Sequence, residues 1–189
     1  MRKKLLQFVL AIALLVGGVL VAKPAAHAST PFWKQSSEKK AYPSVSKHPN
    51  MWILVSKKKQ RTYLVDNGKI LYTMLCSTGT TGDNATPTGT YHIQAEKGTF
   101  FYNQSSGEGA KYWVSWKDHG TYLFHTVPTD ENGNYITSEA KKLGKKASSH
   151  GCVRLSVADA KWLYNNVTTG TKVVITNSGN IKKVIKANS

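Results

Sequence analysis

The residues best able to do chemistry lie in one short stretch, Ser148-Ser149-His150-Gly151-Cys152-Val153-Arg154-Leu155. A cysteine attacks as its thiolate, which a nearby imidazole, a cation or a helix N-terminus favours. Cys152 has His150 two residues before it and Arg154 two residues after it, and a helix is expected to start near Ser156. Cys152 is therefore a candidate nucleophile.

Two further features of the sequence support this interpretation. Gly151 lets the backbone turn and approach closely, so the amides of Gly151 and Cys152 could form an oxyanion hole. A second histidine, His125, stands in Phe124-His125-Thr126 at the end of an expected strand, where a rigid scaffold could aim a general base. The alternative for His125 is a half-buried strand histidine bonded to the backbone. The local chemistry alone leaves both alternatives open.

Other chemistry-bearing residues favour structural roles. Cys76 ends an apolar run, so a small buried thiol is favoured over a functional one. A disulfide between Cys76 and Cys152 would block the nucleophile, and no spacing rule favours it. His150 and Cys152 are too close in sequence for the usual zinc spacing, and residues 79–82 lack the ending of a phosphate-binding loop. We expect no metal and no cofactor.

The elements that must position these residues are mostly strands. Apolar and β-branched runs predict strands at residues 51–55, 62–65, 69–75, 90–93, 112–116, 121–124 and 172–176. Asn67-Gly68 between two of these runs is the strongest short hairpin signal, because both turn positions need positive φ. Residues 77–89 form a long polar loop. The chain is therefore expected to be mainly β.

Helices are few in this pattern. Ser156-Val157-Ala158-Asp159 has the form of a capping box, and Ala160, Leu163 and Val167 continue an apolar helix face to about residue 167. A shorter helix is expected over residues 137–143, ended by Gly144 in the C′ position. We expect one well-defined helix and one short additional helix.

The first 28 residues predict export. Met1-Arg2-Lys3-Lys4 is basic, residues 5–22 carry no charge, and Ala26-His27-Ala28 matches the small-x-small pattern of a signal-peptidase site. The uncharged segment is also long enough to be an uncleaved membrane anchor, which would be the protein's only link to a membrane. With either outcome the rest of the chain is expected to be extracytoplasmic.

The charge of the chain fits an exported protein. Its 26 Lys and Arg outnumber its 10 Asp and Glu, giving +16, of which residues 1–28 carry +4 and the remainder +12. This excess indicates attraction to an anionic cell envelope, and no nucleic-acid-binding motif points to nucleic acid instead. Residues 29–48 are expected to be a tether, 49–177 the catalytic domain and 178–189 a loosely held basic tail.

Three ordered motifs resemble one known family. Ser149-His150-Gly151-Cys152-Val153-Arg154 resembles the S-H-G-C-[IV]-R signature of the L,D-transpeptidase catalytic domain, a YkuD-like family of bacterial cell-wall enzymes. Phe124-His125-Thr126 resembles the segment around that family's catalytic histidine. Residues 76–79 and 86–91 resemble its S-T-G and T-P-x-G-x-[FY] motifs. The resemblance covers about residues 51–176 and implies an L,D-transpeptidase-like mixed β-sandwich.

The resemblance also implies roles for the matched residues. Cys152 would attack the carbonyl of the third residue of a peptidoglycan stem tetrapeptide and expel the terminal D-Ala. His125 would take the thiol proton, with its ring oriented by the carbonyl of Thr126. The other matched residues would form the oxyanion and substrate-binding part of the site: Ser149, His150, Gly151 and Arg154. Arg154 would either hold the substrate or brace the nucleophile loop.

Three outcomes stay open for the reaction. An amine of a second stem would resolve the thioester into a 3→3 cross-link, whereas water would make the enzyme an L,D-carboxypeptidase or endopeptidase. A non-catalytic wall-binding module is disfavoured, because a binder needs no activated thiol. His125 and Cys152 stand 27 residues apart, a longer spacing than in many members of the family. The additional segment around residues 127–134, together with the short helix expected after it, is expected to form a lid over the cleft.

Overall fold

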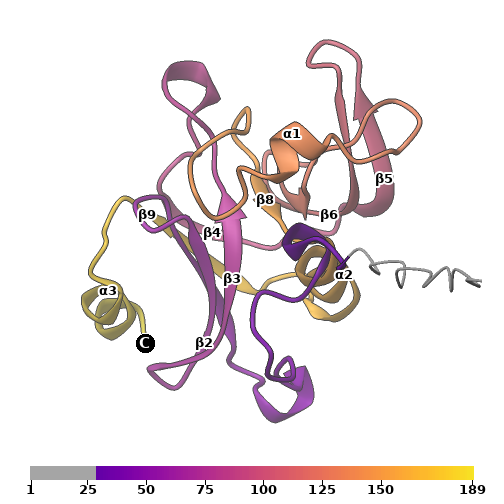
Figure 1. Ribbon diagram of the computed structural model, residues 1–189. Helices are drawn as coiled ribbons and strands as arrows, with labels where there is room; N and C mark the ends of the chain where they lie inside the picture. Colours follow the sequence, from indigo (N-terminus) through magenta and orange to yellow (C-terminus); the bar gives the residue numbers. More distant parts are fainter. Residues whose placement is uncertain (1–28) are drawn as a thin grey trace, which may run out of the picture.

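The structure is a computed structural model that describes residues 29–189 (Figure 1), so the predicted export segment, residues 1–28, lies outside the described residues. The strands are β1 Trp52–Ser56, β2 Arg61–Asp66, β3 Lys69–Ser77, β4 Gly89–His92, β5 Lys97–Asn103, β6 Glu108–Lys117, β7 Tyr122–Thr126, β8 Val153–Leu155 and β9 Lys172–Thr176. The α-helices are α1 Thr137–Ala140, α2 Val157–Asn166 and α3 Ile181–Asn188. The prediction of a mainly β chain is confirmed.

The strands form one mixed sheet in the order β4-β9-β1-β2-β3-β8-β7-β6-β5. The sheet curls until strands from its two ends meet, since Tyr91 of β4 and Trp116 of β6 bring their rings to 5.0 Å. The two halves of the sheet therefore face each other across one core, which joins Ile53 from the first half to Phe124 from the second. The sandwich-like interior is made by one curled sheet.

Two local sequence signals are found where they were expected. Asn67 and Gly68 have φ values of +46° and +71° between β2 and β3, as the hairpin prediction requires. Ser156 caps α2, its Oγ accepting the Asp159 N–H at 3.1 Å. Leu163, on the inward face of α2, is fully buried in the central core. Helix α2 therefore covers the open side of the curled sheet beside β6 and β7.

The short helix is shorter than predicted. Helix α1 ends at Ala140, and the chain continues through a turn to Gly144, whose φ is +72°. The Gly144 N–H donates to the carbonyl of Cys76 at 3.0 Å, so the chain leaves the helix to join β3. A contact between distant segments thus ends this helix early. Within residues 29–189, no helix is both long and apolar enough to cross a bilayer.

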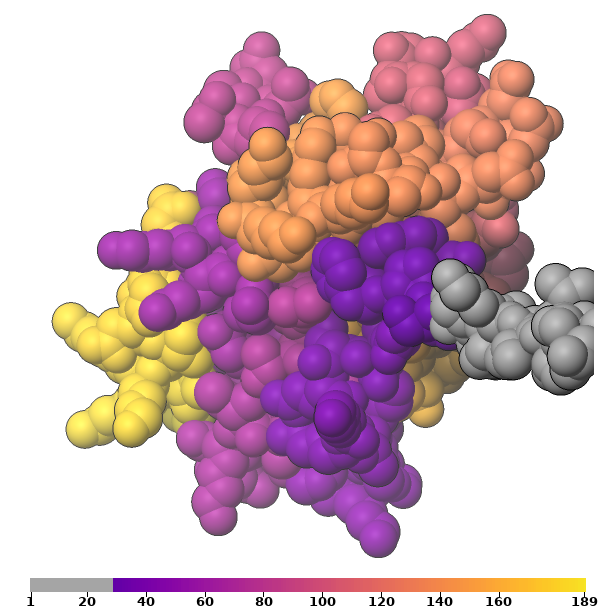
Figure 2. Space-filling model, viewed as in Figure 1, coloured from indigo at the N-terminus to yellow at the C-terminus, as the bar shows by residue number. Residues whose placement is uncertain are grey.

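Residues 29–48, which were expected to be a tether, are packed against the domain. Trp33 is buried with Val127, Ala140 and Leu143, and its ring lies 5.3 Å from that of Tyr135. Figure 2 shows this indigo segment lying on the surface directly below the orange residues that precede β8. The aromatic side chain supplies the apolar burial that the surrounding Ser, Lys and Pro cannot.

A buried carboxylate fixes the same segment further along. Asp159 of α2 accepts hydrogen bonds from the N–H and hydroxyl of Ser37 and from the Tyr42 hydroxyl, the last at 2.6 Å. Tyr42 also stacks on Trp162 with ring centroids 5.2 Å apart. Burial raises the pKa of the Asp159 carboxyl, and the bonds from Ser37 and Tyr42 oppose that rise. Residues 37–42 therefore satisfy a carboxylate that would otherwise be buried without partners.

The expected loose tail is also wrong for most of its length. Residues 181–188 form α3, capped by Asn180, whose Oδ1 accepts the Lys183 N–H at 3.1 Å. Ile185 is buried against Trp52 and Val65 of the sheet. An i, i+3, i+4 pattern of apolar residues at 181, 184 and 185 carries this packing and could have been recognised in the sequence.

The packing of Trp33 leads to a prediction about stability. We expect Trp33→Ala to lower the free energy of unfolding by about 3–5 kcal/mol, because it leaves a cavity in a buried cluster. Urea unfolding of the full-length chain measures this change. The matched control is Phe32→Ala, since the Phe32 side chain next to it is 40% exposed and should be nearly dispensable. An effect of Trp33→Ala as small as that expected of Phe32→Ala would mean that Trp33 does not stabilise the domain.

Candidate active site

Two parallel strands bring the candidate nucleophile and base to the same face of the sheet. In the pairing of β7 with β8, His125 lies opposite Arg154 and Phe124 lies opposite Val153. Because side chains alternate along a strand, Phe124 and Val153 enter the core while His125 and Arg154 face the other way. Cys152 lies two residues before Arg154 and therefore falls on the same face as His125.

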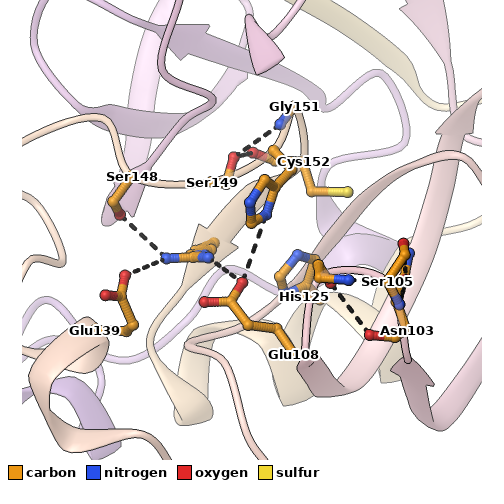
Figure 3. A network of polar contacts seen from close by, with 12 residues as sticks. Asn103, Ser105, Glu108, His125, Glu139, Ser148, Ser149, Gly151 and Cys152 are labelled. Atoms are coloured by element: carbon orange, nitrogen blue, oxygen red, sulfur yellow. Dashed lines mark hydrogen bonds and ion pairs between the residues drawn. The ribbon is translucent and has the colours of Figure 1, made fainter. Parts of the chain in front are cut away.

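These residues surround one cavity of about 730 Å³. Its lining includes most of the predicted site residues: Cys152, His125, Ser149, His150 and Arg154. Thr126 and Gly151 are not part of the lining, but they lie next to His125 and Cys152 and offer backbone groups. The structure thus gathers the predicted residues at a single place (Figure 3).

His125 is oriented by the backbone. Its Nδ1 donates to the carbonyl of Thr126 at 2.6 Å, which leaves Nε2 with a lone pair in the neutral ring. Thr126 is itself held by its hydroxyl, which accepts the Lys111 N–H at 3.0 Å. The pKa of His125 is lowered to about 3, chiefly by burial and also by the nearby Arg154 charge, while the bond to the Thr126 carbonyl opposes the shift. His125 is therefore neutral at pH 7 and able to accept a proton.

Cys152 is a thiol in this structure. Its Sγ donates to the carbonyl of Thr121 at 3.5 Å and accepts the Leu123 N–H at 3.4 Å. Loss of water around the sulfur raises the pKa of Cys152 to about 11, a rise that the Leu123 N–H and the Arg154 charge oppose. Backbone groups of Thr121 and Leu123, at the start of β7, thus hold the thiol in place. A nucleophilic attack by this sulfur requires that its proton be removed.

The helix N-terminus that was expected to favour the Cys152 thiolate lies too far from the sulfur to do so. Helix α2 does begin after Ser156, but the three residues of β8 separate its N-terminus from Cys152. An extended residue spans about 3.3 Å, so the helix end lies beyond the last turn over which its dipole acts. Cys152 and His125 form a pair of neutral groups at pH 7.

Arg154 is almost fully buried between two carboxylates that sequence reasoning missed. One guanidinium nitrogen bonds Glu108, and another bonds Glu139 at 3.0 Å and Ser148 at 3.3 Å. Figure 3 shows Glu108, Glu139 and Ser148 converging on this guanidinium from different segments. Glu108 also lies 3.7 Å from the ring Nδ1 of His150. These bonds favour the bracing role of Arg154 over direct capture of substrate.

The nucleophile loop differs from the expected arrangement of two free amides. The Gly151 N–H already donates to Ser149 Oγ at 3.2 Å, and this hydroxyl donates to the carbonyl of Cys152. Among the hydrogen bonds of residues 29–189, none uses the Cys152 N–H as donor. Gly151 has φ +123°, and a Cβ there would meet the Tyr122 ring at 3.0 Å. Of the two amides expected to form an oxyanion hole, that of Gly151 is already bonded within the described chain.

The expected lid is wrong, because another segment borders the cavity. Of residues 127–134 and helix α1, only Pro128 lines the cavity, while Asp130 accepts the Asn134 N–H at 2.8 Å in a turn of its own. The tip of the β5–β6 hairpin, residues 103–106, lines the cavity instead. Asn103 Oδ1 accepts the Ser105 N–H at 3.0 Å and shapes this tip (Figure 3). This hairpin was not predicted from the sequence, because no strand was assigned to residues 97–103, which form β5.

Cys76 is not paired with Cys152. Both cysteines are free, and Cys76 lies fully buried in the central core. Burial raises the pKa of Cys76 to about 12, so this thiol is inert at neutral pH.

Comparison with known proteins places this geometry in a family. The sequence profile of the L,D-transpeptidase catalytic domain matches residues 50–175. YciB of Bacillus subtilis (strain 168), which is itself named only as a candidate L,D-transpeptidase, is 48% identical over 136 residues. That match covers 71% of this chain and 69% of YciB.

Solved structures have the same fold. An L,D-transpeptidase from Mycobacterium smegmatis matches with a TM-score of 0.55 at 20% identity, over 67% of this chain and 58% of that one. A fused Zn-dependent amidase/peptidase/peptidoglycan-binding domain-containing protein from Clostridium acetobutylicum ATCC 824 matches with a TM-score of 0.50 at 30% identity. That match covers 72% of this chain and 55% of the other, so this chain spans little more than half of either solved structure. By its sequence profile and its relative YciB, the chain belongs to the L,D-transpeptidase catalytic domain family.

Proposed function

We propose that the protein is a cysteine-dependent L,D-transpeptidase acting on peptidoglycan stem peptides. Cys152 forms a thioester with the third residue of a stem tetrapeptide, releases D-Ala and passes the acyl group to an amine of a second stem. The observation that carries this proposal is the placement of Cys152 and a backbone-oriented His125 on one cavity, in a chain of this family. The reaction needs no cofactor.

The protonation states set the order of events. As Sγ of Cys152 bonds to the substrate carbonyl carbon, the thiol proton passes to Nε2 of His125, and the carbonyl oxygen becomes an oxyanion near the Cys152 amide. The bond to D-Ala then breaks, and the imidazolium returns the proton to the leaving amine. Keeping the pKa of His125 low makes it a strong proton donor at this point.

The second half of the reaction reverses these roles. An acceptor amine loses a proton to His125 as it bonds to the thioester carbon, and the sulfur leaves and recovers that proton. Water in place of the amine gives hydrolysis, which is the carboxypeptidase or endopeptidase alternative. A cavity of about 730 Å³ offers room for a donor chain and an acceptor side chain together, which favours transfer.

We also propose that the protein acts outside the cytoplasmic membrane, beside an anionic envelope. Lys58, Lys59 and Lys182 line one surface hollow at the start of α3, and Lys182 and Lys186 line the next. Neither hollow has an acidic residue in its lining. This side of the molecule would contact anionic wall material while leaving the β7–β8 face free for stem peptides.

The test is to incubate the full-length chain with disaccharide-tetrapeptide and follow the masses of the products. We expect loss of D-Ala together with a cross-linked dimer. Loss of D-Ala with monomer alone would assign hydrolysis, and no loss at all would contradict an acyl transfer at Cys152. The matched control is disaccharide-tripeptide, which lacks the D-Ala leaving group and should give no dimer when it is the only stem present.

A further inference from the structure

The nucleophile loop is held by a buried hydroxyl outside its own sequence motif. Thr86 lies in the loop between β3 and β4 and is fully buried. Its Oγ1 is 2.7 Å from the Gly79 nitrogen and 2.7 Å from the Gly151 carbonyl oxygen. An amide can only donate and a carbonyl can only accept, so the single hydroxyl proton of Thr86 must point at Gly151. The direction of both bonds is thereby fixed.

The bond to the Gly151 carbonyl also sets the direction of the Cys152 amide. The Gly151 carbonyl and the Cys152 N–H belong to one planar peptide unit, which is trans because residues 29–189 contain no cis peptide bond. In a trans unit the two groups point in opposite directions. The carbonyl is turned toward buried Thr86, so the N–H points away from Thr86, and Cys152 lines the cavity whereas Thr86 does not. As described above, this N–H has no acceptor within the described chain.

Gly151 cannot hold this peptide plane without help. Its φ of +123° lies where glycine moves freely, so the following peptide unit has little torsional restraint of its own. The β3–β4 loop supplies the restraint, because a Cβ on Gly79 would come within 2.8 Å of the Gly151 Cα. The N–H groups of Ser148 and Ser149 both donate to the carbonyl of Thr78, at 2.8 and 3.1 Å. The two loops therefore pack backbone to backbone, with Thr86 joining them beneath the nucleophile.

We propose that Thr86 is a positioning residue for acyl transfer, holding the Gly151–Cys152 peptide so that the Cys152 N–H is aimed at the oxyanion. Donation to the carbonyl also polarises the peptide unit, which makes its N–H a stronger hydrogen-bond donor. Thr86 does not touch the substrate. This inference rests on the proposed role of Cys152 as an acyl-accepting nucleophile.

The experiment compares two reactions of the same thiol in the full-length chain. Acylation by p-nitrophenyl acetate passes through a tetrahedral oxyanion, whereas alkylation by iodoacetamide displaces iodide at carbon and forms no oxyanion. Thr86→Val keeps the shape of the side chain and removes the hydroxyl. We expect it to slow acylation by about 10- to 100-fold, a loss below that of deleting an oxyanion donor outright, and to leave alkylation unchanged. Cys152→Ala identifies the reacting thiol.

Thr86→Ser supplies the second variant, in case the Val variant does not fold. It keeps the hydroxyl but loses the β-branch that restricts the rotamer, so its acylation rate should lie between those of wild type and Thr86→Val. If the Val variant is unfolded, Thr86→Ala removes the same hydroxyl in its place, and acylation of this variant as fast as that of wild type would overturn the proposal. With a folded Val variant, unchanged acylation or an equal loss of alkylation would overturn it.

The two proposals fail in different ways. If wild type is acylated by the ester and the Thr86 variants are slowed, but no tetrapeptide is processed, the substrate assignment is wrong and the role of Thr86 stands. If the tetrapeptide is processed equally by wild type and the Thr86 variants, the proposed function stands and Thr86 is not a positioning residue.

Discussion

Replacing Cys152 with Ala is expected to abolish release of D-Ala from a stem tetrapeptide, lowering kcat/KM by at least about 10⁴-fold. Cys152 contributes the only thiol among the residues that line the described cavity, and a thiol is a stronger nucleophile than the hydroxyl groups that also line it. The loss should appear in kcat, because the substituted side chain removes the bond-forming atom and leaves the rest of the cavity in place. Release of D-Ala, followed by chromatography, measures the effect.

The other cysteine provides the matched control. Cys76 is also free, but it lies in the core with its pKa raised to about 12, so Cys76→Ala should keep kcat and cost only packing. The comparison separates loss of a reactive thiol from loss of a cysteine. Retained activity in Cys152→Ala, or equal losses in both variants, would show that the nucleophile is assigned wrongly.

Replacing Arg154 with Leu should give a large loss of stability together with a loss of activity. The substitution removes the buried cation that Glu108 and Glu139 share, leaving two carboxylates close together with little water. Breaking one side of a buried ion pair costs about 3–5 kcal/mol, and we expect an effect in that range. Urea unfolding at neutral pH measures it, and activity should fall as well because Cys152 directly precedes β8.

A partner of the same carboxylate provides the control. Lys142 also bonds Glu139, but about a third of its side chain is exposed, so Lys142→Leu should cost under about 1 kcal/mol. Adding Glu108→Gln and Glu139→Gln to Arg154→Leu should recover part of the lost stability, because no unpaired charge then remains. If the two single substitutions cost the same and the added glutamines recover nothing, Arg154 is not the centre of a buried ionic network.

Features decided by neighbouring residues could be predicted from the sequence. The turn at Asn67-Gly68 depends on positive φ at two adjacent positions, and the cap at Ser156 depends on an amide three residues away. The bond between His125 and the Thr126 carbonyl was expected from the family resemblance, and it joins consecutive residues. Each of these three features joins residues that lie within three positions of one another in the sequence.

Features decided by distant partners could not be predicted. Arg154 binds Glu108 and Glu139, which lie 46 and 15 residues away on other elements, so no spacing rule connects them. Strand β8 is only three residues long and has no pattern of its own; it exists because β3 and β7 bond it from both sides. The burial of Trp33 could not be predicted from its polar neighbours, because the residues that pack against its side chain follow about a hundred residues later.

The high pKa of Cys152 bears on how this thiol survives between turnovers. Peroxides and disulfides react with thiolates, and a thiol with a pKa of about 11 presents almost none at neutral pH. Sulfenic acid formation should accordingly be slow in the free protein. The sulfur becomes strongly nucleophilic only as its proton passes to neutral His125 during attack on an electrophile. The burial that makes the resting cysteine unreactive is also what keeps it chemically intact.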